Sequence, residues 1–198
     1  MSRADWATLP DPLPKRINFA KNPELRHGRP SRAHALTPGG SSACQAGRTM
    51  TTSIESARAQ GVLELLTLSD EFALNLYPAD SCYMLDVSEL EAPGVTVAIA
   101  RSGSDAVGMG AMVERGDGSA ELKRMFVRAE ARGQGLASGI LATLENHART
   151  RQVSLLQLET GPLQPEAIAL YEKHGYRRIP NFGQYVGDEF SVCMEKSL

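Results

Sequence analysis

Three glycines stand close together in the stretch 128–145, at positions 133, 135 and 139, where a loop is expected to enter a helix. The first backbone N–H groups of a helix have no helical partners, and they lie at the positive end of the helix dipole. Glycine lets such a main chain approach a bound group closely, and Arg132 adds a positive charge at the entry of the loop. These residue types in this order predict a site for phosphate groups at a helix N-terminus.

The segments around this loop predict the α and β elements that must position it. Periodicity of 3.6 residues, together with proline and glycine signals, predicts helices over residues 61–77, 86–91, 134–149 and 165–175. Alternating or β-branched residues predict strands over residues 53–59, 95–100, 106–113, 120–127, 155–159 and 190–194. The expected order is β-α-α-β-β-β-α-β-α-β, in which the second to fourth strands form an antiparallel meander.

Two ligand classes fit the glycine loop, a dinucleotide and coenzyme A. A dinucleotide fold places a buried, uniformly apolar strand before its glycines, whereas the strand 120–127 contains three charged residues. Glu159 stands about where an acidic ribose ligand would be expected, but only 59 residues follow Gly139, and they give one further strand–helix unit. The order of elements therefore favours a fold that binds coenzyme A.

The run from Val127 to Ala137 resembles the acetyl-CoA signature of the GNAT superfamily of N-acetyltransferases, since it reads Val-x-x-x-x-Arg-Gly-Gln-Gly-Leu-Ala. The expected element order resembles the GNAT fold over about residues 52–198. The resemblance implies an α/β (α+β) fold with a mixed central sheet of about six to seven strands and helices on both faces. Similarity to a bacterial small-molecule-type subgroup of uncharacterised members extends over residues 107–111, 120–125, 158–161, 167–172 and 182–185.

The resemblance implies an acyltransferase that moves the acetyl group of acetyl-CoA, its co-substrate, to a primary amine of a small molecule by direct attack in a ternary complex. It implies a cofactor site made of Met125, Phe126, Val127, Arg132, Gly133, Gln134, Gly135, Leu136 and Ala137. The backbone N–H groups of the first three residues are expected to stabilise the developing oxyanion, by roughly 3–4 kcal/mol each. Gln164 and Pro165 stand where many relatives have an asparagine that binds the cofactor.

Two side chains receive catalytic roles from the same resemblance. Tyr171, on the helix after the fifth strand, is expected to protonate the leaving thiolate, because its ordinary pKa of about 10 suits that transfer. Glu121, on the fourth strand, resembles a glutamate that deprotonates the amine in histone-acetylating relatives. Two other interpretations of Glu121 stay open: it pairs with Lys123 or Arg124, or water chains carry the proton in place of a residue base.

The acceptor is expected, again by resemblance, to contact the segments 76–86 and 180–188. Their aromatic and acidic residues suit a small amine, whereas Lys123 and Arg124 suit a carboxylate, so an amino-acid-like acceptor would use both. The aromatic residues there are Tyr77, Tyr83, Phe182 and Tyr185, and the acidic ones are Asp80, Asp86 and Asp188. Two alternative functions are a non-catalytic acyl-CoA-binding sensor and a protein acetyltransferase acting on N-termini or lysines.

Composition excludes several other classes of protein. The 198 residues, 42% of them hydrophobic, are enough for one core, and the formal net charge of −2 gives no field that attracts nucleic acid or an anionic membrane. No apolar run approaches the roughly 20 residues of a membrane-spanning helix, and no secretory signal is present. The three cysteines are far apart and suit neither a disulfide framework nor a metal site. We therefore expect a cytoplasmic monomer or homodimer without metal.

Residues 1–49 differ in composition from residues 50–198, which form the expected N-acetyltransferase domain. They hold eight Lys and Arg against three Asp and Glu, six of the eleven prolines, and no sustained apolar period. Such a segment cannot bury enough surface to offset its ordering entropy, so a disordered basic leader is predicted. A translation start at Met50 and an arm that docks on an acidic partner are the two interpretations left open.

Overall fold

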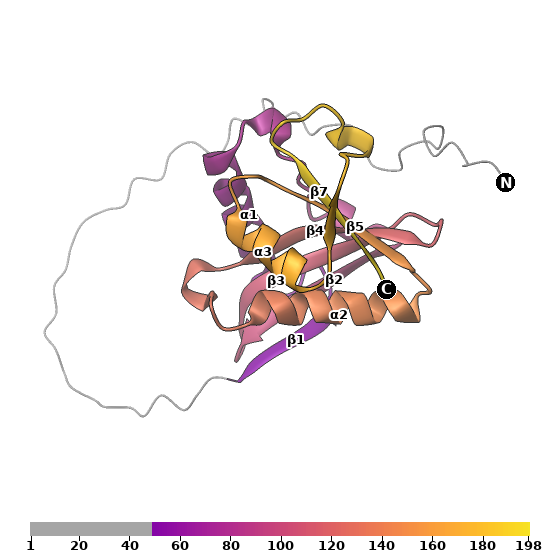
Figure 1. Ribbon diagram of the computed structural model, residues 1–198. Helices are drawn as coiled ribbons and strands as arrows, with labels where there is room; N and C mark the ends of the chain where they lie inside the picture. The colour runs from indigo at the N-terminus through magenta and orange to yellow at the C-terminus, as the bar shows by residue number, and fades with distance from the viewer. Residues whose placement is uncertain (1–48) are drawn as a thin grey trace, which may run out of the picture. The chain divides into compact units, whose positions relative to one another are not determined.

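The computed structural model describes residues 49–198, so the leader predicted over residues 1–49 lies, apart from Thr49, outside the described residues. The strands are β1 (Met50–Glu55), β2 (Val95–Ser102), β3 (Asp105–Glu114), β4 (Ser119–Val127), β5 (Leu155–Thr160), β6 (Arg177–Ile179) and β7 (Val192–Ser197). The helices are α1 (Val62–Leu76), α2 (Leu136–Thr150) and α3 (Pro165–Lys173). Figure 1 shows these elements as one sheet with helices around it, which confirms the predicted α/β class.

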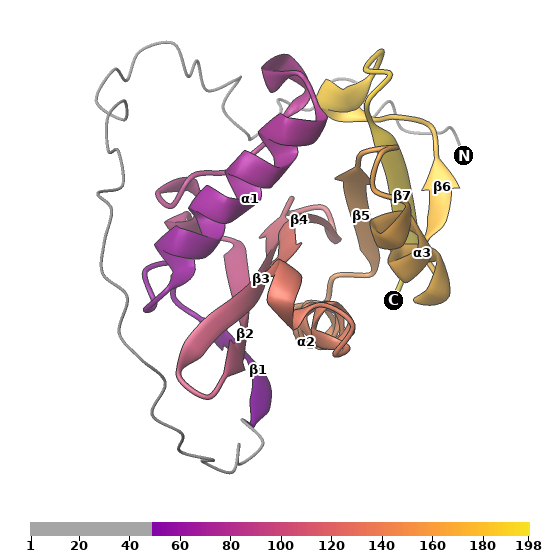
Figure 2. The ribbon, with the colours of Figure 1, turned by 90° about the vertical axis from the view of Figure 1, so that its left-hand side faces the viewer.

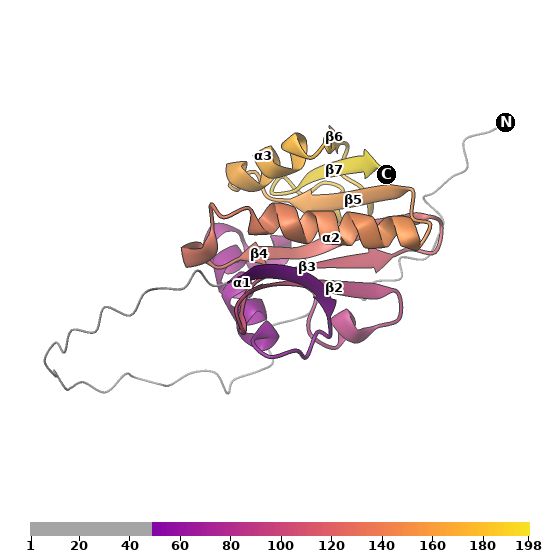
Figure 3. The ribbon, with the colours of Figure 1, turned by 90° about the horizontal axis from the view of Figure 1, so that it is seen from below.

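The seven strands form one mixed sheet in the order β1-β2-β3-β4-β5-β7-β6. Every neighbouring pair is antiparallel except β4 and β5, which are parallel. Helix α1 covers one face, whereas α2 and α3 lie on the other (Figure 2). Figure 3 shows α2 between the β1–β4 half of the sheet and the half that contains β5–β7. The predicted arrangement, about six to seven strands with helices on both faces, is confirmed.

Strands β4 and β5 separate toward their C-terminal ends. Their pairing ends at Leu122 and Leu158, although β4 continues to Val127 and β5 to Thr160. The main-chain groups on that edge of β4 therefore have no neighbouring strand, and a ligand can occupy the opening between the two strand ends.

A β-bulge lies in β4 at the point where the two strands separate. Lys123 pairs with Ala111 and Phe126 with Met109, so Arg124 and Met125 together face the single residue Gly110 of β3. Arg124 has a φ of 56°, a left-handed conformation that non-glycine residues rarely adopt. The bulge follows closely after the last residue of β4 that pairs with β5, and Met125 lines the opening beyond it.

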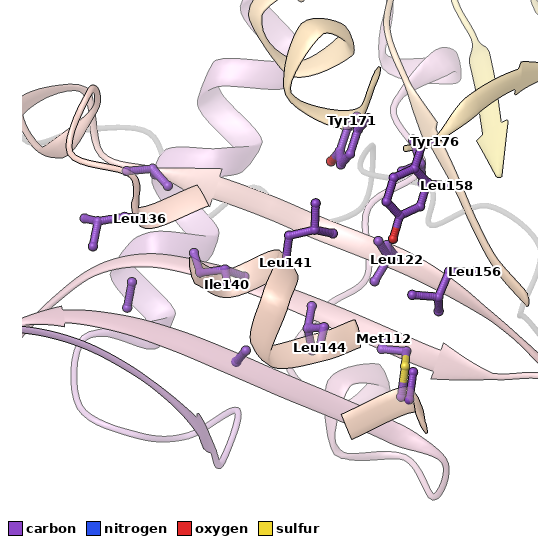
Figure 4. Close-up of a cluster of buried hydrophobic side chains, with 14 of the residues drawn as sticks. Met112, Leu122, Leu136, Ile140, Leu141, Leu144, Leu156, Leu158, Tyr171 and Tyr176 are labelled. Carbon is purple, nitrogen blue, oxygen red and sulfur yellow. The ribbon is translucent and has the colours of Figure 1, made fainter. Parts of the chain in front are cut away.

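The main core lies between α2 and the sheet. The apolar face predicted for this helix is buried, and it packs against side chains of β3, β4, β5 and α3 (Figure 4). The buried residues of this face are Leu136, Ile140, Leu141, Leu144 and Ala148. Each buried leucine or isoleucine contributes about 1.5–3 kcal/mol. A Cβ at Gly110 would lie 2.5 Å from the Met125 sulfur and 2.7 Å from Ile140, so glycine permits the close packing of α2 on the bulge.

Three parts of the fold differ from the sequence predictions. The short helix predicted over residues 86–91 is a three-residue 3-10 turn, Glu89–Glu91, in which only Leu90 is buried. Strand β6 was not predicted, because the three residues Arg177–Ile179 are too few to show an alternating pattern. The strand predicted over residues 190–194 begins at Val192.

Within residues 49–198, no helix is long and apolar enough to cross a bilayer. The same part of the chain holds no group of three or more His, Cys, Asp and Glu side chains that could bind a metal ion.

Candidate active site

A groove of about 640 Å³ runs between the N-terminus of α2 and helix α3. The C-terminal part of β4 forms its floor, and Phe72 and Leu76 of α1 close one end. All of the residues predicted to bind the cofactor line this groove except Gln134. The groove therefore brings together the strand end and the glycine loop that the sequence places next to each other.

The glycine loop presents its main chain to the groove. Gly133 and Gly135 have φ values of 75° and 78°, and a Cβ at either position would meet no atom within 4 Å. Glycine is therefore required there for the left-handed backbone and leaves open space beside it. The first intrahelical amide is that of Gly139, which donates to the Gly135 carbonyl at 3.0 Å. The amides of residues 133–138 precede it and are suited to hold a diphosphate.

Arg132 ties the glycine loop to its surroundings. Its Nε donates to the Val127 carbonyl oxygen at 3.1 Å, and its guanidinium lies 5.2 Å from the ring centre of Phe72. Despite these two contacts, Arg132 is exposed to solvent. Arg132 thus holds the loop against the end of β4 and against α1, and it keeps a positive charge at the entry of the groove.

A second, smaller cavity of about 140 Å³, here called the chamber, lies on the other side of the β4 bulge. Its wall comes from α1, the segment 77–84, the ends of β4 and β5, and Phe190. The residues that line both the groove and the chamber are Phe72, Met125, Phe126, Gln164, Ala167 and Tyr171. The two cavities therefore meet at the bulge and at Tyr171.

Tyr171 lies where the groove and the chamber meet. It is only 4% exposed, and its ring packs edge-on against Tyr176 with 5.7 Å between centroids (Figure 4). Burial, and to a smaller degree the charge of Glu159, raises the pKa of the Tyr171 hydroxyl well above its ordinary value. The phenol stays protonated at neutral pH, so it can act as a proton donor at the point where the two cavities meet.

Glu121, the predicted base, is buried in an ion-pair network and does not line the chamber. Its carboxylate lies 2.6 Å from Arg115 Nη2, accepts a hydrogen bond of 2.5 Å from the Tyr185 hydroxyl, and lies 3.5 Å from Lys123 Nζ. Burial raises the pKa of Glu121, but the charges of Lys123 and Arg115 outweigh it and hold that pKa below its ordinary value. Such a carboxylate is a weak base. The geometry favours the alternative in which Glu121 pairs with Lys123, and it adds Arg115 as a partner, whereas Arg124 pairs with Asp70 instead.

Glu159 is the carboxylate that lines the chamber, at the C-terminal end of β5. Its Oε1 accepts a hydrogen bond of 3.1 Å from the Ser191 hydroxyl. Burial raises the pKa of Glu159 to about 7, although the charge of Lys123 lowers it and Glu121 and Asp188 raise it further. A carboxylate with a pKa near neutrality can take a proton from an amine and release it again.

The Acetyltransferase (GNAT) family model matches residues 59–176 of this chain. The protein belongs to the GNAT acetyltransferase family. It is therefore an acyltransferase, and its groove lies where this chain's GNAT signature meets the end of β4.

Three proteins illustrate the similarity. An IAA acetyltransferase of Azospirillum brasilense is 38% identical over 150 residues, which cover 75% of this chain and 98% of that protein. An uncharacterized N-acetyltransferase of Bacillus subtilis is 32% identical over 123 residues, which cover 61% of this chain and 82% of that protein. A solved chain from Klebsiella pneumoniae, assigned as an acyl-CoA N-acyltransferase, is 34% identical with a TM-score of 0.64, over 76% of this chain and 99% of its own.

The two segments expected to contact the acceptor contribute unequally to the chamber of this GNAT protein. Tyr77 and Tyr83 line it, whereas Phe182, Tyr185 and Asp188 do not. Of the other acidic candidates, Asp80 and Asp86 are exposed outside the chamber. Phe190, two positions beyond the second predicted segment, lines the chamber.

Tyr77 anchors the loop between β5 and α3. Its hydroxyl accepts a hydrogen bond of 2.9 Å from the Leu163 amide, and a Cβ at Gly161 would lie 2.1 Å from its ring. Gln164, which stands where many relatives have asparagine, occupies the N-cap position of α3 without a capping hydrogen bond from its side chain, and it lines both cavities. It is therefore placed where a polar side chain can reach a ligand in either cavity.

Sequence reasoning missed the position of Glu159 in the chamber and the conformation of Arg124. From the sequence alone, Glu159 is a candidate only for a dinucleotide ligand. The signal that could have placed it in the ligand site is an acidic residue at the C-terminal end of a strand, where ligands bind in parallel sheets. Arg124 gave no local signal for its bulge, since its left-handed backbone depends on the register of β3 against β4.

Proposed function

We propose that the protein is an N-acetyltransferase that moves the acetyl group of acetyl-CoA to a primary amine of a small molecule, by direct attack in a ternary complex. The observation that carries this proposal is the meeting of the groove and the chamber at Tyr171 and the β4 bulge. A thioester held in the groove and an amine held in the chamber would face each other there, so no acyl-enzyme is needed. The small chamber volume, about 140 Å³, favours a small acceptor.

The residues of the groove fit acetyl-CoA. The amides of residues 133–138 and the charge of Arg132 suit its diphosphate, and the open space beside Gly133 and Gly135 leaves room for it. When bound, acetyl-CoA supplies an activated acyl group on a thiol leaving group. Met125, Phe126 and Val127 line the groove at the bulge, where β4 has lost β5 as a neighbour. Their N–H groups stabilise negative charge on the carbonyl oxygen, by roughly 3–4 kcal/mol each.

Glu159 and Tyr171 carry the two proton transfers in this proposal. The ammonium form of the acceptor first releases one proton to solvent, and Glu159 takes a second proton from the nitrogen as its bond to the acyl carbon forms. Tyr171 donates its hydroxyl proton to the sulfur as the carbon–sulfur bond breaks. The proton held by Glu159 then restores Tyr171, and the charges of the site return to their starting state. Glu121 supports Tyr185 and the cations around it and takes no proton.

The proposed enzyme works without metal, as a monomer or homodimer in the cytoplasm. Free thiols at Cys82 and Cys193 support a reducing compartment. The Azospirillum relative is named an IAA acetyltransferase, so IAA is included beside the amines in the panel of compounds tested.

The test combines calorimetry with a thiol-release assay. Acetyl-CoA is expected to give a clear binding signal, whereas a nicotinamide dinucleotide gives none. Thiol release from acetyl-CoA should depend on an added small amine, and mass spectrometry should find that amine acetylated. Acetyl-CoA binding without turnover on any amine would indicate a sensor. Acetylation of lysate proteins alone would indicate a protein acetyltransferase.

A further inference from the structure

We propose that the acceptor carries a carboxylate beside its amine, as an α-amino acid does, and that Arg124 and Lys123 bind this carboxylate while Glu159 faces the amine. The inference rests on the proposed N-acetyl transfer, because it takes the chamber as the acceptor site. It adds the chemical class of the acceptor, which the family and the fold leave open.

The charged groups that line the chamber are Lys123, Arg124 and Glu159. Their nearest partners lie outside the lining: Asp70 pairs with Arg124, while Lys123 Nζ donates to the Tyr185 hydroxyl at 2.6 Å and lies 3.5 Å from Glu121, which is shared with Arg115. Two cations therefore face the ligand against one carboxylate. A simple alkylammonium ion would add a third positive charge to this chamber, whereas a zwitterion adds no net charge and has an opposite charge for each wall.

Arg124 has unused binding capacity. Its side chain is 4% exposed and its Nη1 bonds to Asp70, yet its Nε is buried and has no hydrogen-bond partner among residues 49–198. An unsatisfied buried donor costs about 1–3 kcal/mol, so such groups are rare in folded proteins. A ligand carboxylate that the planar guanidinium holds through two parallel hydrogen bonds would satisfy it.

The backbone of Arg124 points to the same conclusion. A φ of 56° is unfavourable for arginine and places it in the β4 bulge. Strained residues of this kind are found where the surrounding structure holds them for a function. Here the strain fixes a guanidinium beside Met125, whose backbone is proposed to stabilise the oxyanion. A carboxylate on Arg124 would hold its own amine close to the thioester.

The two charge-recognition groups come from different strands. Arg124 and Lys123 lie on β4, and Glu159 lies at the end of β5, beyond the last paired residues. The gap between the strand ends therefore separates the two cationic residues on β4 from the acidic residue on β5. Tyr83 and Phe190 complete the lining with aromatic surface that suits an apolar side chain of the acceptor.

The experiment compares matched acceptors that differ only at the carboxylate. One series is alanine, alaninamide and ethylamine, and the other is phenylalanine, phenylalaninamide and phenethylamine, with spermidine as a polycation. Thiol release from acetyl-CoA gives kcat/KM for each compound. We expect at least one of the two amino acids to exceed its amide by about 30-fold or more, because a charged hydrogen-bond pair is lost in the amide.

Arg124→Gln is expected to reduce the preference for the acid over the amide to about threefold, because kcat/KM for the acid falls further than kcat/KM for the amide. Arg124→Gln combined with Asp70→Asn keeps the local charge balanced and should give the same loss of preference. Arg128→Gln is the matched control, because Arg128 also pairs with α1, through Glu64 at 2.9 Å, but lies outside the chamber. It should keep the wild-type preference.

Amide or amine acceptors that react as fast as the acids, or a preference for spermidine, would overturn the inference and leave N-acetyl transfer intact. A preference that survives both Arg124 variants would also overturn it. Failure of the proposed function looks different: no thiol release with any amine and no calorimetric signal with acetyl-CoA.

Discussion

The groove and the chamber meet at one point, yet they recognise their ligands by different means. The groove offers main-chain amides at the start of α2 and glycines that leave space beside them. The chamber offers buried side-chain charges, Lys123, Arg124 and Glu159, brought together from two strands. Main-chain recognition tolerates changes of side chain around it, whereas side-chain recognition depends on a few residues and on their charge states. The five predictions below, with the acceptor series above, test this contrast.

The largest effect is expected behind the chamber, at Glu121. Glu121→Gln removes the negative charge between Arg115 and Lys123 and leaves two cations without their counter-ion. Breaking such a buried ion pair from one side costs about 3–5 kcal/mol. Chemical denaturation should show a loss of this size, whereas acetyl-CoA affinity measured on the folded protein should stay within about twofold. If Glu121→Gln kept the wild-type stability but lost the pH dependence of kcat, Glu121 would be the base after all.

The next largest effect is expected at Glu159. Glu159→Gln should lower kcat/KM about 100-fold, because general bases typically contribute at least this much. In the wild type, kcat/KM should rise as pH increases through about 7, where the carboxyl loses its proton, and the variant should lack this rise. Glu172→Gln, at an exposed site on α3, is the control. If Glu159→Gln kept the wild-type pH profile of kcat/KM, Glu159 would be excluded as the general base.

The same group links pH to the stability of the fold. Its folded pKa, about 7, lies above its ordinary value of 4.5, so its favourable contribution is fully present below about pH 4.5. That contribution is lost as pH rises through 7, because the charged form is then buried. Glu159→Gln should therefore raise the melting temperature relative to the wild type by a few degrees more at pH 8 than at pH 5.

A smaller effect is expected where the two cavities meet. Tyr171→Phe removes the proton donor but keeps the ring that packs against Tyr176. It should lower kcat about 30-fold and leave acetyl-CoA affinity and stability nearly unchanged. Thiol esters with more acidic leaving groups should lose less, since they need less help from a donor. Equal losses for all leaving groups would show that Tyr171 acts only in packing.

The smallest effect is expected in the groove. Gly135→Ala introduces a Cβ that meets no atom within 4 Å, but it disfavours the φ of 78° that the loop needs. The free loop should leave this conformation, so acetyl-CoA affinity should fall about fivefold, which matches about 1 kcal/mol of backbone strain. Gly116→Ala is the matched control, because Gly116 has a φ of 80° and equally open surroundings in the β3–β4 turn. Equal affinity in both variants would contradict main-chain recognition.

The groove could be predicted from the sequence because its parts are local. The loop from Arg132 to Ala137 is continuous with β4 and α2, and its glycines have a physical meaning wherever a helix begins. The chamber could not be predicted in the same way. The raised pKa of Glu159 depends on burial by segments far along the chain, and the position of Arg124 depends on a register shift between strands. Strand β6 was missed because three residues show no period.

Gly110 has a consequence for the length of chain that acetyl-CoA must span. Since Gly110 has no side chain, the Met125 and Ile140 side chains pack directly over it, which keeps the β4 bulge close to the helix that begins at the glycine loop. The flexible arm between the diphosphate and the sulfur of coenzyme A has a fixed covalent length, so the distance from the glycine loop to the bulge must match that length. A single methyl group at position 110 would push α2 outward and increase the distance from the glycine loop to the bulge. The thioester would then no longer reach the amine.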